Sequence, residues 1–398
     1  MESNSSAHGI LLIALFLCFS QPQLSAQAEA AGTEAPPSEN NSWAATTESR
    51  NLLDDSTPTK TNTTHTEFNG RTLDRTVTEG VGSGGGYNPY LETERETVRV
   101  DSSTVRTVER VFGRDPNGGR ALIRLTEEEK RNLPGGDTKI LRTVSNSTVN
   151  GALQVVERDI QETRHINPDV RQTTTTVLTP DVNGGFAPSM RRQEEEKRTS
   201  EHEVQFKRST LLPDVNGDWQ VNEVREGNIK QQDGQNDTKE ENVLRRTADG
   251  NLSVVERTVT KQSESVPGER RKTVETYSKT VPGGFGDGGL ILNQRVTTVQ
   301  RLRSDGGTTT EQKLEQKNPG EPSGDVRLTQ KTIDIVSAGT NGTSQGQQTI
   351  QSVDPNGALS TVWVDTRHKA GDSPIMVDTR KGNNSSPAQP STGVPPKP

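Results

Sequence analysis

The chain has 398 residues, of which 26% are hydrophobic, 3% aromatic and 25% charged, and its formal net charge is −7. Ordinary globular domains are roughly 45–50% apolar when glycine is counted, so a thick core is excluded and part of the chain is expected to be disordered. Acidic and basic residues are interspersed without a basic stripe, which excludes a typical nucleic-acid partner.

The N-terminus has the features of an export signal. An apolar run over 9–19 is followed by a break at 20–22 and by small residues at 26–28. The run is shorter than the roughly 20 apolar residues that cross a bilayer. Residues 1–28 are therefore predicted to be a secretory signal peptide, although 1–8 contain no basic residue; the alternative is an uncleaved anchor. The chain would be exported to the periplasm, the cell surface or the extracellular space.

The cysteine content and the hydropathy of the chain after the signal exclude disulfides, thiolate metal sites and membrane-spanning helices. Cys18 is the only cysteine and lies within the signal, so the mature chain would have no disulfide and no thiolate metal site. No later apolar run is long enough for a helix to cross a membrane, so no membrane span is expected after signal cleavage. Residues 29–80, rich in Thr, Ser, Asn and Pro, and the Pro-rich tail 370–398 are predicted to be disordered flanks.

A 33-residue period runs between these flanks. Asx-Gly pairs recur at that spacing, which predicts about nine repeat units over 81–369 with an insertion near 283–289. Large apolar residues stand two positions after most of these glycines, and the next apolar position is two further on, which indicates strands. The turn glycines are Gly118, Gly151, Gly184, Gly217, Gly250 and Gly357.

Each Asx-Gly phrase is predicted to be a hairpin turn. In Asp115-Pro116-Asn117-Gly118, the Asp, Pro and Gly stand at the positions that a type I turn prefers, and the glycine can adopt the left-handed conformation of a G1 bulge. A looser turn falls midway through most units. Each unit therefore reads as strand, Asx-Gly turn, strand, looser turn.

These units predict an all-β fold, an elongated array of antiparallel β-hairpins with a thin core and a narrow apolar belt beside the Asx-Gly turns. An outer-membrane barrel is excluded on the ground that neither face of the strand after Gly151 is apolar. A thick sandwich is excluded because apolar positions thin out away from the turns, and a propeller because 33 residues are too few for a blade. A β-solenoid and a largely disordered chain are the alternatives.

No chemical site stands out. Asp214, Asn216 and Asp218 place three oxygen-bearing side chains at alternate positions, which makes them the candidate for calcium; the glycine falls too early for an EF-hand loop, which favours a turn. The five histidines lack metal-ligand spacing, and the glycine runs lack the phosphate-loop pattern. No cofactor and no catalytic residue is predicted.

The sequence is therefore interpreted as an exported, non-enzymatic structural or adhesive repeat protein of the cell envelope or the extracellular space. Its partners would be other copies, through an exposed sheet edge, or an extracellular polymer. A carbohydrate- or calcium-dependent binding module and a hydrolase with an unrecognised carboxylate site are the two alternatives.

Overall fold

The computed structural model describes residues 42–52, 58–82, 84–115, 117–232, 236–279, 289–318, 324–339, 343–354 and 356–370. The predicted signal peptide, the tail beyond 370 and most of the predicted insertion at 283–289 lie outside these residues. Within them, no helix has the length and apolar character that crossing a membrane requires.

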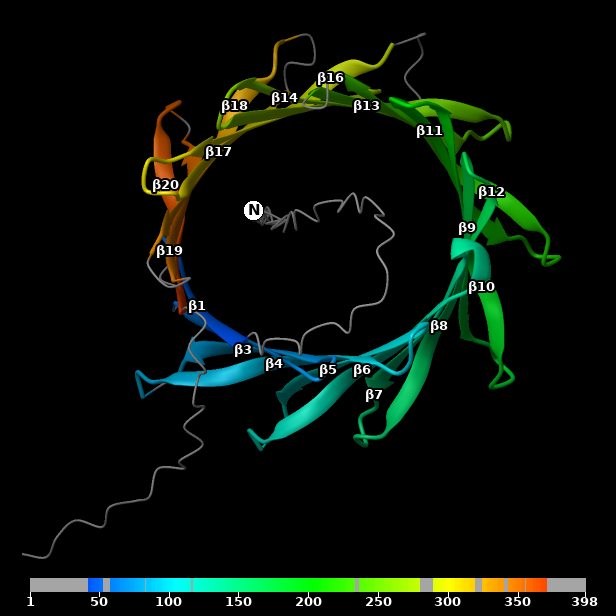
Figure 1. Ribbon diagram of the computed structural model, residues 1–398, viewed down its shortest axis with the longest axis horizontal. Coiled ribbons are helices and arrows are strands. Elements are labelled where there is room, and N and C mark those ends of the chain that lie inside the picture. Colours follow the sequence, from blue (N-terminus) through cyan, green and yellow to red (C-terminus); the bar gives the residue numbers. More distant parts are fainter. Residues whose placement is uncertain are drawn as a thin grey trace, which may run out of the picture. The chain divides into compact units, whose positions relative to one another are not determined.

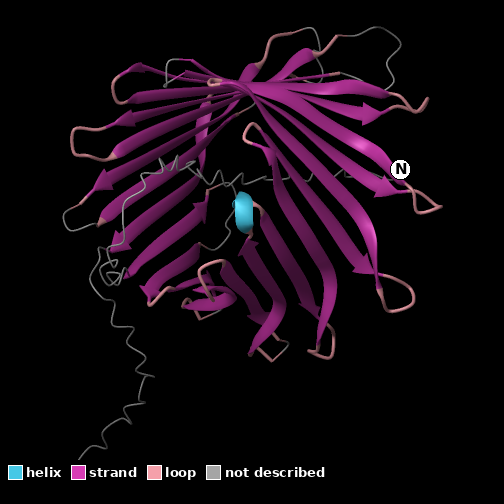
Figure 2. Ribbon diagram, turned by 45° about the vertical axis from the view of Figure 1, so that its right-hand side comes forward, coloured by secondary structure: helices cyan, strands magenta, loops and turns pink. Residues whose placement is uncertain are grey.

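The described part of the chain is almost entirely antiparallel β-sheet (Figures 1 and 2). Besides one 3-10 turn, η1 (Pro134–Gly136), its elements are β1 (Ser42–Asn51), β2 (Thr59–Phe68), β3 (Arg71–Val81), β4 (Tyr87–Arg99), β5 (Thr104–Arg114), β6 (Arg120–Asn132), β7 (Thr138–Ser147), β8 (Leu153–Asn167), β9 (Val170–Pro180), β10 (Phe186–Ser200), β11 (Glu203–Pro213), β12 (Trp219–Gln232), β13 (Asn236–Arg246), β14 (Leu252–Val266), β15 (Glu269–Ser278), β16 (Ile291–Leu302), β17 (Thr308–Gln316), β18 (Arg327–Ala338), β19 (Ser344–Val353) and β20 (Leu359–Ala370).

Every strand pairs with the next one along the chain, and the first pairs with the last. β1 lies antiparallel to β20, with Ser49 opposite Asp365 and Thr47 opposite Arg367. This pairing closes the sheet into a 20-stranded barrel, seen end-on in Figure 1. The all-β antiparallel prediction is confirmed, but the elongated array, the solenoid and the disordered chain are wrong.

The exclusion of a barrel was also wrong. It required an apolar outer face, which is a condition for contact with lipid and not for closure of the sheet. A sheet closes when its ends can pair, which removes both exposed edges whatever the outer face carries. The predicted disordered flank 29–80 needs correction as well, since β1, β2 and most of β3 lie inside it. These strands are rich in Thr, a polar residue that also has a high propensity for β-strands.

A β-bulge recurs five residues after the turn glycine. The register shifts at this point in β6, β8, β10, β12 and β14, and again in β4 and β20. A bulge bends its strand and increases the local twist. Repeating one in each unit therefore curves the sheet progressively, which brings β20 back to β1.

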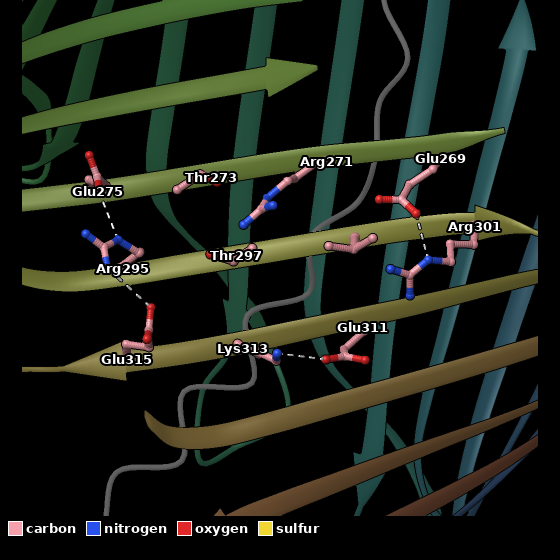
Figure 3. A pocket seen from close by; sticks show the side chains of 11 residues that line it. Glu269, Arg271, Thr273, Glu275, Arg295, Thr297, Arg301, Glu311, Lys313 and Glu315 are labelled. Carbon is pink, nitrogen blue, oxygen red and sulfur yellow. Dashed lines mark hydrogen bonds and ion pairs between the residues drawn. The ribbon is translucent and has the colours of Figure 1, made fainter. Parts of the chain in front are cut away.

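The barrel has two faces that the registers assign residue by residue. Successive residues of a strand alternate between faces, and directly opposed residues of neighbouring strands share one. Figure 3 views the wall from outside, with the far side of the barrel behind it, and the side chains of Glu275, Arg295 and Glu315 stand on the near side. Their face is the outer face, and the other lines the lumen.

The core is thin, as the composition predicts. The buried apolar side chains of the described residues are Val144, Val177, Phe206, Leu211, Val224, Val243 and Val259. Val144, Val177 and Val243 fall at multiples of the 33-residue period and lie beside the bulges at the Asx-Gly end. The apolar belt expected there is present, but as part of a closed wall.

Candidate functional site

The Asx-Gly turns form one end of the barrel, which we call the Asx-Gly rim. All six predicted turn glycines have φ between 77° and 86°, a region that residues with a Cβ rarely adopt. In the first, the N–H of Gly118 donates to the carbonyl of Asp115 (2.9 Å), and the N–H of Asp115 donates to the carbonyl of Gly119 (2.9 Å). The Asp115 carboxylate also accepts the N–H groups of Asn117 (2.8 Å) and Gly119 (2.7 Å).

The calcium candidate is one of these turns. Asp214 Oδ1 accepts the N–H groups of Asn216 (2.8 Å) and Asp218 (3.0 Å), and its Oδ2 accepts a bond from Gln220 Nε2 (2.9 Å). The backbone N–H of Asn216, with Gln220, lowers the pKa of Asp214, so this carboxylate stays ionised. Among the described residues no three His, Cys, Asp or Glu side chains gather as a metal group. A calcium site at Asp214, Asn216 and Asp218 stays a prediction.

The outer wall carries a shallow groove of about 560 Å³ over β15, β16 and β17 (Figure 3). Arg295 lies between Glu275 (2.9 Å) and Glu315 (3.7 Å). Further along, Arg301 meets Glu269 at 2.8 Å. Four acidic and four basic side chains line the groove, so it has no net preference for an anion or a cation.

A second ion-pair group lies on β3, β4 and β6. The Glu92 side chain is only 10% exposed and contacts Arg75 (2.6 Å) and Arg120 (2.9 Å). Both guanidiniums meet the same carboxylate, so Glu92 has no free oxygen for acid or base catalysis. Acidic residues of neighbouring strands thus form cross-strand ion pairs, and the hydrolase alternative finds no support among the described residues.

The lumen face carries rows of polar side chains, beside an apolar row of Val144, Val177 and Val243 near the Asx-Gly rim. Threonine hydroxyls hydrogen-bond across neighbouring strands there, in the pairs Thr63–Thr76 (3.3 Å), Thr97–Thr107 (3.2 Å) and Thr163–Thr173 (3.0 Å). Ion pairs on the same face include Arg142 with Asp159 (3.0 Å) and Arg225 with Glu241 (3.3 Å). Hydroxyls and charges in these rows prefer contact with water, so the lining suits a water-filled interior.

Sequence reasoning missed a cluster on the lumen face where the barrel closes. Trp43 stacks on His65 with ring centroids 5.3 Å apart, and Lys369 lies 5.1 Å from the Trp43 ring. His65 in turn contacts Asp74 at 2.6 Å. Lys369 lies more than 300 positions from Trp43, and only the pairing of β1 with β20 brings the two together, so no local pattern could have indicated the whole cluster.

The outer face near the Asx-Gly rim carries two apolar rows, which we call the outer collar. The first row stands two residues after the turn glycines, and the second lies next to the bulges. Arginines lie against this collar: the Arg158 guanidinium is 4.2 Å from the Phe186 ring, and that of Arg191 is 4.5 Å from the Trp219 ring. The collar comprises Tyr87, Phe112, Leu122, Leu153, Val155, Leu178, Phe186, Leu211, Trp219, Val221, Leu244, Leu252, Val254 and Leu359.

Comparisons with known proteins add the following. No family model matches the chain, and no curated protein matches it. Similar solved structures include the siderophore receptor PirA from Pseudomonas aeruginosa, at 9% identity, with 84% of this chain and 81% of that chain covered and a TM-score of 0.46. Another is OccK3 from the same organism, at 7% identity, with 83% and 94% covered and a TM-score of 0.41. A third is the ferric citrate transporter FecA, at 8% identity, with 85% and 80% covered and a TM-score of 0.39.

The expected role and partners need correction. The hairpins close into a barrel and do not form an extended repeat array, so the structural or adhesive repeat protein is wrong. Closure leaves no free sheet edge among the described strands, which overturns self-association through that edge. The extracellular polymer, expected as the partner of an extended array, is wrong for the same reason. The expectation of no membrane span considered helices alone, whereas a closed barrel is the form in which strands cross membranes.

Proposed function

We propose that this chain is a non-enzymatic transport barrel of the cell envelope, whose water-filled lumen lets polar solutes pass. The closed ring of 20 strands around a polar face is the observation that carries the proposal. Barrels of about 16–18 strands already leave an aqueous channel, so 20 strands enclose more space than side chains alone can fill. Export and an envelope location agree with the signal-like N-terminus.

Two adjacent residues in the middle of β9 test whether the lumen is closed and wet. Thr175 shares the lumen face with Thr173, and Thr174 points outward. In a Cys18→Ser background, Thr175→Cys and Thr174→Cys should both react with a small maleimide. A maleimide on a long polyethylene glycol chain should react with Thr174→Cys only. Equal reaction at both positions would show that no enclosed lumen exists.

Passage itself is measured as ion current through single barrels held in a solid-state nanopore. We expect a steady current that falls when Thr175→Cys is modified and does not change when Thr174→Cys is modified. These two variants differ by one position, so they control for expression and for thiol chemistry. A barrel that excludes the large reagent but carries no current would refute transport while leaving the fold intact.

A further inference from the structure

We propose that the Asx-Gly rim over β7–β14 is a membrane-docking end, which enters the interfacial region of a lipid bilayer. Three features lie in order along the barrel here: apolar turn tips, the outer collar and a row of arginines. The inference goes beyond the proposed function, because docking does not require that solutes pass through the lumen.

The turn tips are apolar and fully exposed. Val149, Val182 and Val215 occupy the same position in three successive turns, 33 residues apart, and their exposed fractions are 104%, 101% and 101%. Isolated exposed apolar residues are common, but a row at equivalent positions forms a patch. Successive tips are two strands apart, so they are spaced by roughly 10 Å along the rim.

Two of the turn carboxylates beside these tips are not bare charges. Those of Asp181 and Asp214 each accept two backbone N–H groups at 2.8–3.0 Å. Such hydrogen bonds replace part of the hydration that a carboxylate loses near a bilayer. The turns can therefore sit among lipid headgroups.

The outer collar comes next, and its composition suits the interface. Leu153 and Leu252 are 41% and 42% exposed, and Phe186 and Trp219 occupy the same position in the two units between them. Aromatic side chains, and tryptophan above all, favour the boundary between acyl chains and headgroups.

Arginines follow on the same outer face. Arg158, Arg191 and Arg257 stand at matching positions beyond the bulges of β8, β10 and β14. Among the described residues, neither Arg158 nor Arg191 forms an ion pair, and both lie over collar aromatics. A guanidinium placed just above an apolar surface is suited to lipid phosphates, because its stem packs on the apolar groups while its charge stays at headgroup level.

The height of the outer collar along the strands sets how deeply the rim can insert into a bilayer. Its two rows are roughly 7 Å apart along the strands, whereas the apolar interior of a bilayer is about 30 Å thick. Interfacial helices bury their apolar face about 5–10 Å deep, which matches the collar. The collar is therefore the surface that contacts acyl chains.

Tryptophan fluorescence can test this directly, because only Trp219 of the three tryptophans lies in the collar. Trp43 and Trp363 both face the lumen. With Trp43→Phe/Trp363→Phe, emission should shift to the blue on vesicles of phosphatidylcholine and phosphatidylglycerol, and brominated acyl chains should quench it. With Trp219→Phe/Trp363→Phe, the remaining Trp43 should not be quenched. Quenching of Trp43 but not Trp219 would overturn the proposal.

Vesicle flotation measures the contributions of tips and arginines. Val149→Ser/Val182→Ser/Val215→Ser should weaken binding about tenfold or more, since three exposed apolar groups are lost. Val100→Ser, at a turn of the opposite rim and 60% exposed, is the matched control and should bind normally. Arg158→Gln and Arg191→Gln should each weaken binding to the anionic vesicles about fivefold.

The remaining outcomes overturn the proposal. Loss of binding in Val100→Ser but not in the triple variant would place docking at the opposite rim. No flotation of the folded wild-type chain, together with self-association that the triple valine variant abolishes, would show that a second copy covers the rim. Circular dichroism melting of each variant separates lost docking from lost folding.

Discussion

A disulfide across β1 and β20 gives the sharpest test of the fold. The bond between Leu52 N–H and the Val362 carbonyl (2.8 Å) makes the alternate pair Ser49–Asp365 a non-hydrogen-bonded pair, where Cα atoms lie about 4.5 Å apart. In an open sheet of 20 strands the same residues would be roughly 90 Å apart. Ser49→Cys/Asp365→Cys in a Cys18→Ser background should therefore oxidise within one chain, giving a faster-migrating band on a non-reducing gel.

The cross-link should also stabilise the chain. Closing a loop of over 300 residues contributes about 5–6 kcal/mol in the chain-entropy model, which can be read from the denaturation midpoint with and without reductant. Gln347→Cys/Thr366→Cys, which joins β19 to β20, is the control that must oxidise whether or not the barrel closes. Oxidation of the control alone would refute closure.

Three further predictions concern turns and ion pairs. Gly118→Ala should cost about 1–2 kcal/mol because φ is 80°, whereas Gly84→Ala, also in open space but without a positive φ, should be nearly neutral in chemical denaturation. Glu92→Gln should cost about 1–3 kcal/mol because two guanidiniums lose a charged acceptor in a nearly buried site. Glu162, whose side chain is 38% exposed, is the control, and Glu162→Gln should change the free energy of unfolding by less than about 1 kcal/mol. Because the pKa of Asp214 is lowered, its contribution to the free energy of unfolding is complete above the ordinary carboxyl pKa of about 3.9 and is lost as the pH falls through the lowered value. Asp214→Asn should therefore flatten the acid side of the profile of stability against pH. An unchanged profile would count against this role.

The sequence predicted what is local in this molecule. The Asp, Pro, Asn and Gly of each phrase carry a turn whose geometry depends on four neighbouring residues, and the 33-residue spacing follows from repeating one hairpin. The apolar belt could be found for the same reason, since its members stand at fixed offsets from each glycine. The bulge at the fifth residue after the glycine had a signal too: the apolar alternation changes phase there, as between Val221 and Val224.

Closure could not be found in this way, because it depends on residues at the two ends of the described chain. β1 and β2 have few apolar side chains, and a Thr-rich segment such as Thr59–Phe68 resembles disordered sequence as closely as it resembles a strand. Lys369 joins the lumen cluster around Trp43 and His65 only once β20 lies beside β1. The rejection of the barrel failed for a different reason, since an apolar outer face is a condition for contact with lipid and not for strand pairing.

The seam between β1 and β20 shows why closure can still be favourable. Joining segments about 320 residues apart, instead of the roughly 30 of a hairpin, adds only about 2 kcal/mol of loop-closure entropy, because that cost grows by roughly 0.6 kcal/mol per doubling. The eight residue pairs in the β1–β20 register offset this loss of entropy. The bulges have already curved the sheet, so the two edges meet without further ordering of the strands between them. Closure therefore depends on the curvature that the repeat builds into every hairpin, and removing bulges should open the barrel before it melts the hairpins.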